Sequence, residues 1–209
     1  MTNSERVVAE LRERLRGTAP RGHGHLSTGL AALDELLGGG FPEGRLVEVV
    51  GGQASCATSV AVQALAAATR RGEVVAYIDW PDAFDPRSAA GAGLDLARTL
   101  WVRPQTVKDA IAATDLVLGA GGFGVVALDL FGEKKKCNHD YISSSSFLRL
   151  ARAAERAKTT FLVIAAEHVA GTFAALTLTC GRACVAIERS KGFSPGRTAR
   201  VDFRSPRIQ

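Results

Sequence analysis

The sequence lacks the features that mark membrane, secreted and disulfide-bonded proteins. No run of about 18 apolar residues, the length needed to span a bilayer, occurs in it. The amino-terminal stretch MTNSERVVAELRERLRG is charged throughout, unlike a secretory signal. Only four cysteines are present, without a C-x-x-C pair. We therefore expect a cytoplasmic protein that keeps its thiols reduced and forms no disulfides.

Metal-ligand spacing is missing as well. Four residues could be combined into a zinc site: Cys137, His139, Cys180 and Cys184. Their spacings match no usual zinc pattern, and cysteine is common as a small neutral core residue. We predict no metal and no cofactor.

What the sequence does contain is the composition of one globular domain with a short appendage. Hydrophobic residues make up 46% of the chain, an ordinary share for a protein with a packed core. The net charge of +5 and the pI near 9.3 permit attraction to nucleic acid, but they equally fit a solvated basic surface. The positive charge gathers in two places, KKK at 134–136 and the arginine-rich stretch from residue 189 to residue 207.

The first residues predict a helical arm and a linker. Val7, Leu11 and Leu15 fall on one face of a helix, which ends before the glycine- and proline-bearing stretch GTAPRGHGHLSTG. The apolar stripe either folds back onto the core of this chain or docks on another subunit or protein. We assign residues 1–25 to this arm and residues 26–209 to the core domain.

From residue 26 onward, short β-branched runs alternate with helical periods. Four near-continuous apolar runs predict strands buried on both faces: RLVEVV (45–50), EVVAYID (73–79), GVVALDL (124–130) and TFLVIAA (160–166). Helices are predicted over 58–71, 105–118 and 146–158, the last capped by Ser146. The alternation predicts an α/β fold with a mostly parallel twisted sheet flanked by helices, and residues 183–204 predict an antiparallel hairpin at one edge.

The stretch GGQASCAT (51–58) has the layout of a phosphate-binding loop between a strand and a helix. Such a loop reads G-x-x-x-x-G-K-[ST], where the lysine neutralises phosphate and the hydroxyl binds magnesium. Gly51 and Thr58 occupy the first and last of these positions, but Cys56 and Ala57 replace the second glycine and the lysine. Because phosphoryl transfer depends on charge stabilisation, efficient ATP hydrolysis is not expected. The segment is either scaffold alone or a weak nucleotide or anion site.

An acid follows the third predicted strand, where related nucleotide sites carry a magnesium-coordinating or water-ordering carboxylate. Such an acid can also be a solvated or capping residue. With it, the remnants of a nucleotide site are Gly51, Ser55, Thr58 and Asp129.

Two blocks of the sequence resemble RecA recombinases. LSTGLAALDELLGGGFPEGRLVEVVG (26–51) is similar to the RecA segment that leads into the P-loop strand, and YIDWPDAFDPRSAAGAGLD (77–95) to the stretch after the P-loop helix, with Asp79, Asp85 and Pro86 matching. The resemblance implies a RecA-like core.

The departures from RecA are informative. Where the resemblance places the catalytic glutamate, this chain has Pro81, and where it places a glutamine that senses the γ-phosphate, the chain has Glu167. Together with Cys56 and Ala57, these four lost positions indicate a pseudo-ATPase with no catalytic residues.

The DNA-binding loops of RecA are also altered. The first corresponds to residues 131–146, which carry three lysines and a tyrosine that either contact DNA or form a solvated charged run. The second is reduced to VAGTFAA (169–175), so RecA-style strand exchange is expected to be lost. Near the last hairpin, Arg189 and Lys191 either match a pair of cations in RecA or belong to an ordinary basic edge of the sheet. The candidate DNA contacts are Lys134, Lys135, Lys136, Tyr141, Arg189 and Lys191.

The combination of a helical arm, a degenerate nucleotide site and a short second loop is similar to the ImuA family of bacterial mutagenesis cassettes. That resemblance implies a non-catalytic accessory protein of SOS-induced translesion mutagenesis, with an ImuB-type polymerase homologue or RecA as partner, through Val7, Leu11 and Leu15. Two alternatives stay open: a DNA-stimulated ATPase of the RecA or RadA kind, and a protein that binds single-stranded DNA.

Overall fold

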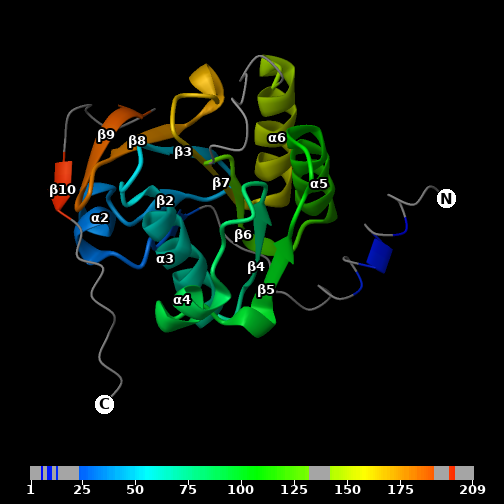
Figure 1. The fold of residues 1–209 in the computed structure, drawn as a ribbon, viewed down its shortest axis with the longest axis horizontal. Coiled ribbons are helices and arrows are strands. Elements are labelled where there is room, and N and C mark those ends of the chain that lie inside the picture. The colour runs from blue at the N-terminus through cyan, green and yellow to red at the C-terminus, as the bar shows by residue number, and fades with distance from the viewer. Residues whose placement is uncertain are drawn as a thin grey trace.

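The structure is a computed structural model that describes residues 24–131, 142–190 and 198–200, together with residues 6, 9, 10 and 13. Its centre is an eight-stranded sheet with the order β10-β9-β8-β3-β7-β6-β4-β5 (Figure 1). The strands are β3 (Leu46–Gly51), β4 (Val74–Asp79), β5 (Thr99–Val102), β6 (Phe123–Asp129), β7 (Thr160–Ala165), β8 (Leu176–Cys180), β9 (Cys184–Ser190) and β10 (Thr198–Arg200).

The five strands β4, β6, β7, β3 and β8 form the parallel interior of the sheet. Strand β3 lies between β7 and β8 and pairs in parallel with both. Every residue of β3, β6 and β7 is buried, as expected for strands covered on both faces. The four apolar runs of the sequence are therefore confirmed as strands, and their carboxyl ends share one edge of the sheet.

Helices cover both faces of this sheet (Figure 1). One layer contains α2 (Ala31–Leu36) and α3 (Ala57–Arg70), whose apolar residues join one core cluster with the sheet. The other contains α5 (Val107–Ala120) and α6 (Ser144–Ala157), which build a second cluster. A short helix, α4 (Pro86–Gly91), and two 3-10 turns, η1 (Leu96–Arg98) and η3 (Gly171–Phe173), lie in connections.

One helix start differs from the prediction. Ser146 was expected to cap the helix over 146–158, but the N-cap is Ser143, whose hydroxyl accepts a hydrogen bond from the Ser146 amide at 3.3 Å. The prediction was wrong because four consecutive serines can all serve as caps. Ser143 has the extended backbone that an N-cap requires, and Ser146 lies inside the first turn.

The segment that leads into the core is held by one carboxylate. Asp34 in α2 accepts hydrogen bonds from the Ser27 hydroxyl at 2.6 Å and from the Thr28 amide at 2.7 Å. Strands β1 (His25–Leu26) and β2 (Phe41–Pro42) pair beside it in a small antiparallel sheet. The S-T-G turn and the L-D pair of the first RecA-like block are thus one hydrogen-bonded unit.

The predicted antiparallel hairpin closes one edge of the sheet, where β9 pairs with β8 and with β10. None of the helices in the described part of the chain combines the length and apolar character needed to cross a membrane. The predicted arm contacts, Val7, Leu11 and Leu15, lie outside the described residues.

Candidate functional site

The loop that joins β3 to α3 has the course of a P-loop, but its first glycine is explained by packing. A Cβ on Gly51 would collide with the Ser55 side chain and come within 3.0 Å of the Cys180 carbonyl oxygen. Gly51 pairs with Cys180 at the end of β3 and β8. Its presence therefore follows from close packing and is not by itself a sign of phosphate binding.

The backbone amides of this loop have partners within the protein. The Cys56 amide donates to the Gly181 carbonyl oxygen at 2.7 Å, and the Ser55 amide donates to the Gly52 carbonyl oxygen at 3.1 Å. The Ala57 amide lies 3.4 Å from the Ser55 hydroxyl. A P-loop binds phosphate through amides of this kind at a helix N-terminus. Three of them are here engaged by the protein's own oxygen atoms.

The two replaced positions face the protein interior. The exposed fraction of Cys56 is 3% and that of Ala57 is 0%, and both belong to the core cluster under α2 and α3. A hydrogen bond with the Cys180 thiol lowers the pKa of Cys56 to about 7, with the backbone at Cys56 and Cys184 adding to this effect and burial opposing it. The same hydrogen bond and burial raise the pKa of Cys180. Thr58, the remaining hydroxyl, is exposed.

Asp129 is neither solvated nor directed at the loop. Its exposed fraction is 3%, and it accepts hydrogen bonds from the Tyr77 hydroxyl at 2.6 Å and from the Phe131 amide at 2.7 Å. Burial raises the pKa of Asp129 to about 6, although both hydrogen bonds oppose the shift. The alternative of a solvated acid is thus wrong, and the alternative of a capping acid fits the bond to Phe131.

The other two lost positions supply no replacement chemistry. Pro81 is buried two residues after the end of β4, and Glu167 is exposed two residues after the end of β7. Asp79, the last residue of β4, is fully buried and accepts hydrogen bonds from the Ala83 and Phe84 amides in the turn before α4. The acid that ends β4 is therefore used to hold the turn behind it.

A cavity of about 310 Å³ opens beside the start of α3. Thr58, Ser59 and Gln63 line it from α3, and Phe84, Asp85 and Ser88 line it from the α4 side. Among the described residues no lysine or arginine lines it, while Asp85 contributes a carboxylate. The charge of the cavity disfavours an anion. Together with the engaged amides and the buried Asp129, it does not fit a magnesium-bound nucleoside triphosphate.

The sequence interpretation missed a polar and aromatic cluster at the outer strand. The Trp101 indole nitrogen donates to Asp79 Oδ2 at 3.1 Å, and the Arg103 guanidinium lies 5.1 Å from the centre of the Trp101 ring. Arg103 also forms two hydrogen bonds with Asp82, at 2.6 and 3.0 Å. These contacts join β5 to the turn after β4, a pairing that periodicity alone could not reveal.

A second missed residue is Glu48, in the middle of β3. Its exposed fraction is 0%, and Oε1 accepts from the Val169 and Ala170 amides, both at 2.7 Å. Its other oxygen lies 3.4 Å from Nδ1 of His168, whose Nε2 lies 3.2 Å from Glu188. An acid inside the apolar run LVEVV was the available signal, because a buried charge requires partners.

Several predicted site residues are not placed. Lys134, Lys135, Lys136, Tyr141 and Lys191 lie outside the described residues, and Arg189 is described only as a backbone position on β9, opposite Thr177. The described residues contain no group of three or more His, Cys, Asp or Glu that could hold a metal ion. Two of the four zinc ligands considered above, Cys137 and His139, are outside them.

Comparison with known sequences identifies relatives of the first part of the chain. Residues 16–138 match the RecA N-terminal domain family. Protein RecA of Arthrobacter sp. (strain FB24) is 41% identical over 105 residues, 50% of this chain and 30% of that protein. Protein RecA of Synechococcus sp. (strain WH7803) is 38% identical over 104 residues, 50% of this chain and 27% of that protein. The chain thus spans less than a third of the length of these relatives.

A solved structure extends the likeness in fold. The crystal structure of the RadB recombinase superposes with a TM-score of 0.70, at 24% identity, over 86% of this chain and 97% of that chain. The predicted α/β fold, with helices on a mostly parallel sheet and a hairpin at its edge, is confirmed.

Proposed function

The chain belongs to the RecA N-terminal domain family, and from this premise we propose that it is a non-catalytic accessory protein of bacterial SOS-induced translesion mutagenesis, of the ImuA kind. It acts through protein contacts with an ImuB-type polymerase homologue, with RecA, or with both. Its effect on RecA is to impede filament activity.

The proposal rests mainly on the closed P-loop, by which we mean residues 51–58 with backbone amides that are bonded to oxygen atoms of the protein itself. Ala57 supplies no charge and is fully buried, while the amides of Ser55 and Cys56 donate to carbonyl oxygens of the protein itself. A triphosphate would need those amides and a cation at the same point. Retention of the frame without this chemistry supports a role in which the fold presents surfaces to partners rather than turning over nucleotide.

The segment after β7 supports the loss of strand exchange. Only residues 166–175 join β7 to β8, and Glu48 holds this connection through the Val169 and Ala170 amides. A connection that is short and anchored to a buried carboxylate leaves little backbone to contact DNA. Contacts with DNA would then rest on the lysine run 134–136, which lies outside the described residues.

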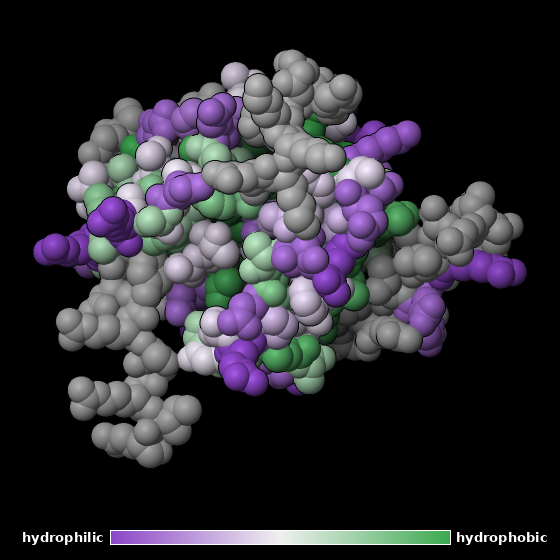
Figure 2. Space-filling view, viewed as in Figure 1, coloured by the Kyte–Doolittle hydropathy of each residue, from purple (hydrophilic) through white to green (hydrophobic). Residues whose placement is uncertain are grey.

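The outer strand β5 offers a surface for a protein partner. In the described part of the sheet it pairs only with β4, so its other side presents unpaired backbone groups. Among the described residues, the large apolar side chains with the greatest exposure are Trp101 in β5, at 37%, and Leu96 just before it, at 42%. Figure 2 shows apolar surface around this end of the sheet. Trp101 is held by Asp79 and Arg103, as suits a rigid anchor for an added strand.

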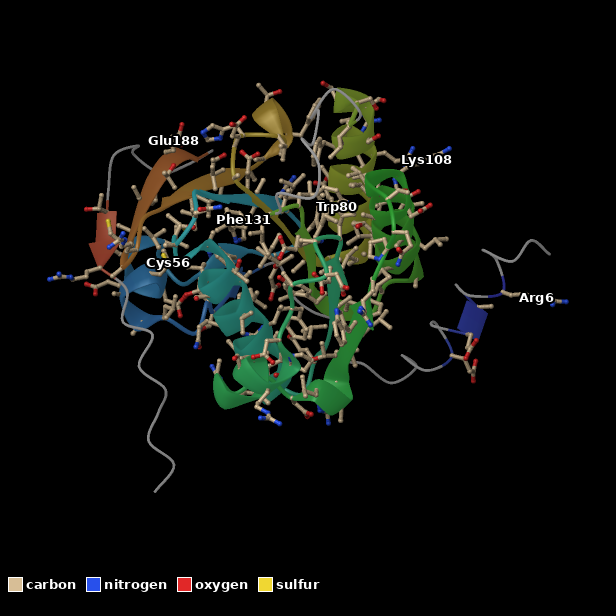
Figure 3. The ribbon with its side chains drawn as sticks, viewed as in Figure 1. Arg6, Cys56, Trp80, Lys108, Phe131 and Glu188 are labelled. Carbon is tan, nitrogen blue, oxygen red and sulfur yellow. The ribbon has the colours of Figure 1, made fainter. Side chains whose placement is uncertain are left out.

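The proposal is tested by adding the purified protein to a RecA strand-exchange reaction and by co-purification with RecA and with an ImuB-type homologue. We expect slower strand exchange and capture of at least one partner. The variant Trp101→Ala should weaken both effects, whereas Lys108→Ala, at an exposed position on α5 (Figure 3), should weaken neither. Unchanged strand exchange together with no capture of either partner would refute the proposal.

Calorimetry with a non-hydrolysable ATP analogue and Mg²⁺ separates this proposal from an ATPase. We expect no binding at millimolar nucleotide. Saturable, magnesium-dependent binding that is lost in Thr58→Ala would favour the enzyme instead.

A further inference from the structure

Three thiols gather where the closed P-loop meets the β8–β9 hairpin. Cys180 ends β8, Cys184 begins β9, and Cys56 caps α3. The Cys56 amide bonds to the Gly181 carbonyl oxygen at 2.7 Å, and its Sγ lies 3.9 Å from the Cys184 carbonyl oxygen. Figure 3 shows Cys56 at the start of α3, beside these strands. Residues separated by more than a hundred positions are thus in direct contact.

Two of the three thiols are buried. Cys56 and Cys180 have exposed fractions of 3% and 5%. The Cys56 amide bonds to the carbonyl oxygen of Gly181, the residue after Cys180, and the Cys180 thiol is the main cause of the lowered pKa of Cys56. Cys184 is exposed. Cys180 pairs with Val185 across the hairpin, so the neighbouring Cys184 points to the opposite face of the sheet from Cys180. The geometry therefore selects Cys56 with Cys180.

We propose that Cys56 and Cys180 form a reversible disulfide when the protein meets a peroxide, so that the former P-loop is a thiol oxidation site. The bond would tie the start of α3 to the end of β8 in the arrangement that the Cys56 amide and the Gly181 carbonyl already hold. This inference does not depend on the proposed partners.

The chemistry balances with hydrogen peroxide as the two-electron oxidant. Cys56 first loses its thiol proton, and the thiolate attacks one peroxide oxygen. The O–O bond breaks, and the leaving hydroxide takes up that proton as the first water, giving a sulfenic acid at Cys56. The Cys180 sulfur then attacks Sγ of Cys56, the S–O bond breaks, and its thiol proton leaves with the hydroxyl group as water. In sum, two thiols and one peroxide give one disulfide and two waters.

The environments of Cys56 and Cys180 determine which thiol reacts with the peroxide and which one then forms the disulfide. The hydrogen bond from the Cys180 thiol and the N-terminus of the 14-residue helix α3 both stabilise a thiolate at Cys56. Charge at Cys56 disfavours a thiolate at Cys180. Once Cys56 is a neutral sulfenic acid this opposition is removed, and Cys180 becomes the resolving thiol.

The test is peptide mapping of the full chain after treatment with hydrogen peroxide under native conditions and alkylation of the remaining thiols. Trypsin places the four cysteines on separate peptides, 46–70, 137–149, 159–182 and 183–189. We expect a mass loss of about 2 Da per chain and a cross-linked pair of peptides 46–70 and 159–182, which separate on reduction. Thermal melting of the oxidised protein should rise by roughly 5–10 °C.

Variants supply the matched controls. Cys184→Ser should keep the cross-link, and Cys180→Ser should abolish it and leave Cys56 at the sulfenic or sulfinic stage. If Cys180→Ser does not fold, the peptide map of the unaltered chain is sufficient to show which two cysteines are cross-linked. A dominant cross-link to Cys184, or a Cys56 that is still fully alkylated after Cys184 has been oxidised, would overturn the proposal.

Discussion

The Tyr77 hydroxyl donates a 2.6 Å hydrogen bond to Oδ2 of Asp129 between the neighbouring strands β4 and β6. Both side chains are buried. Burial and the charge of Asp129 raise the pKa of Tyr77 well above its usual value, so its proton stays on the phenol. The carboxylate that a nucleotide site would direct at magnesium is instead bonded within the protein.

This pair predicts a pH dependence of stability. Because burial raises the pKa of Asp129 from 3.8 to about 6, the protonated acid stabilises the fold, and this contribution is lost as pH rises through 6. We expect the unfolding free energy of the wild type to fall by about 3 kcal/mol relative to Asp129→Asn between about pH 4 and pH 6. Urea unfolding across this range measures it. The control change Asp115→Asn, at a side chain that is 39% exposed and lies 3.3 Å from Arg149, should run parallel to the wild type, and parallel curves for Asp129→Asn would contradict the prediction.

Repairing the P-loop sequence should not repair the site. In the double variant Cys56→Gly with Ala57→Lys, the new lysine begins at a position with 0% exposure, and Pro81 and Glu167 are unchanged. We expect no DNA-stimulated ATP hydrolysis and a loss of roughly 2–5 kcal/mol in unfolding free energy. A phosphate-release assay and urea unfolding measure the two effects. Recovered turnover would show that the frame still holds a competent site.

Glu48 should matter more for stability than its exposed neighbour in the same network. Glu48→Ala leaves the Val169 and Ala170 amides without their buried acceptor, at a cost of about 2–4 kcal/mol. Hydrogen exchange at these two amides should accelerate. Glu188→Ala, at a side chain that is 49% exposed, should change stability by less than about 0.5 kcal/mol. Equal effects of the two changes would argue against the anchoring role of Glu48.

The helix cap offers a fourth prediction. Ser143→Ala removes the hydroxyl that accepts from the Ser146 amide at 3.3 Å, although the Ser143 carbonyl oxygen still accepts from the same amide at 2.9 Å. The change should cost about 0.5–1 kcal/mol in unfolding free energy. Ser145→Ala, in the same serine run but not the cap, is the matched control and should cost clearly less. Denaturant unfolding of both variants measures the two costs. A larger cost for Ser145→Ala than for Ser143→Ala would show that another serine caps the helix.

The sequence by itself determined the four central strands, the edge hairpin and three of the helices, whereas β5, α2 and α4 were not predicted. Apolar runs such as LVEVV and TFLVIA can be buried only as strands covered on both faces, and the helical periods between them require crossovers to a parallel neighbour. It also determined the loss at Cys56 and Ala57, because the charge and the bare backbone that a phosphate needs are properties of single residues.

Only the tertiary structure decided what replaced the lost chemistry. The closure of the loop depends on Gly181, and the burial of Asp129 depends on Tyr77, 52 positions away. The contacts of Glu48 and Trp101, and the meeting of Cys56 with Cys180, likewise join segments that are distant in the chain. Local periodicity specifies which residues are buried, whereas hydrogen-bond partners follow from strand order and register, which are set only when the whole sheet assembles.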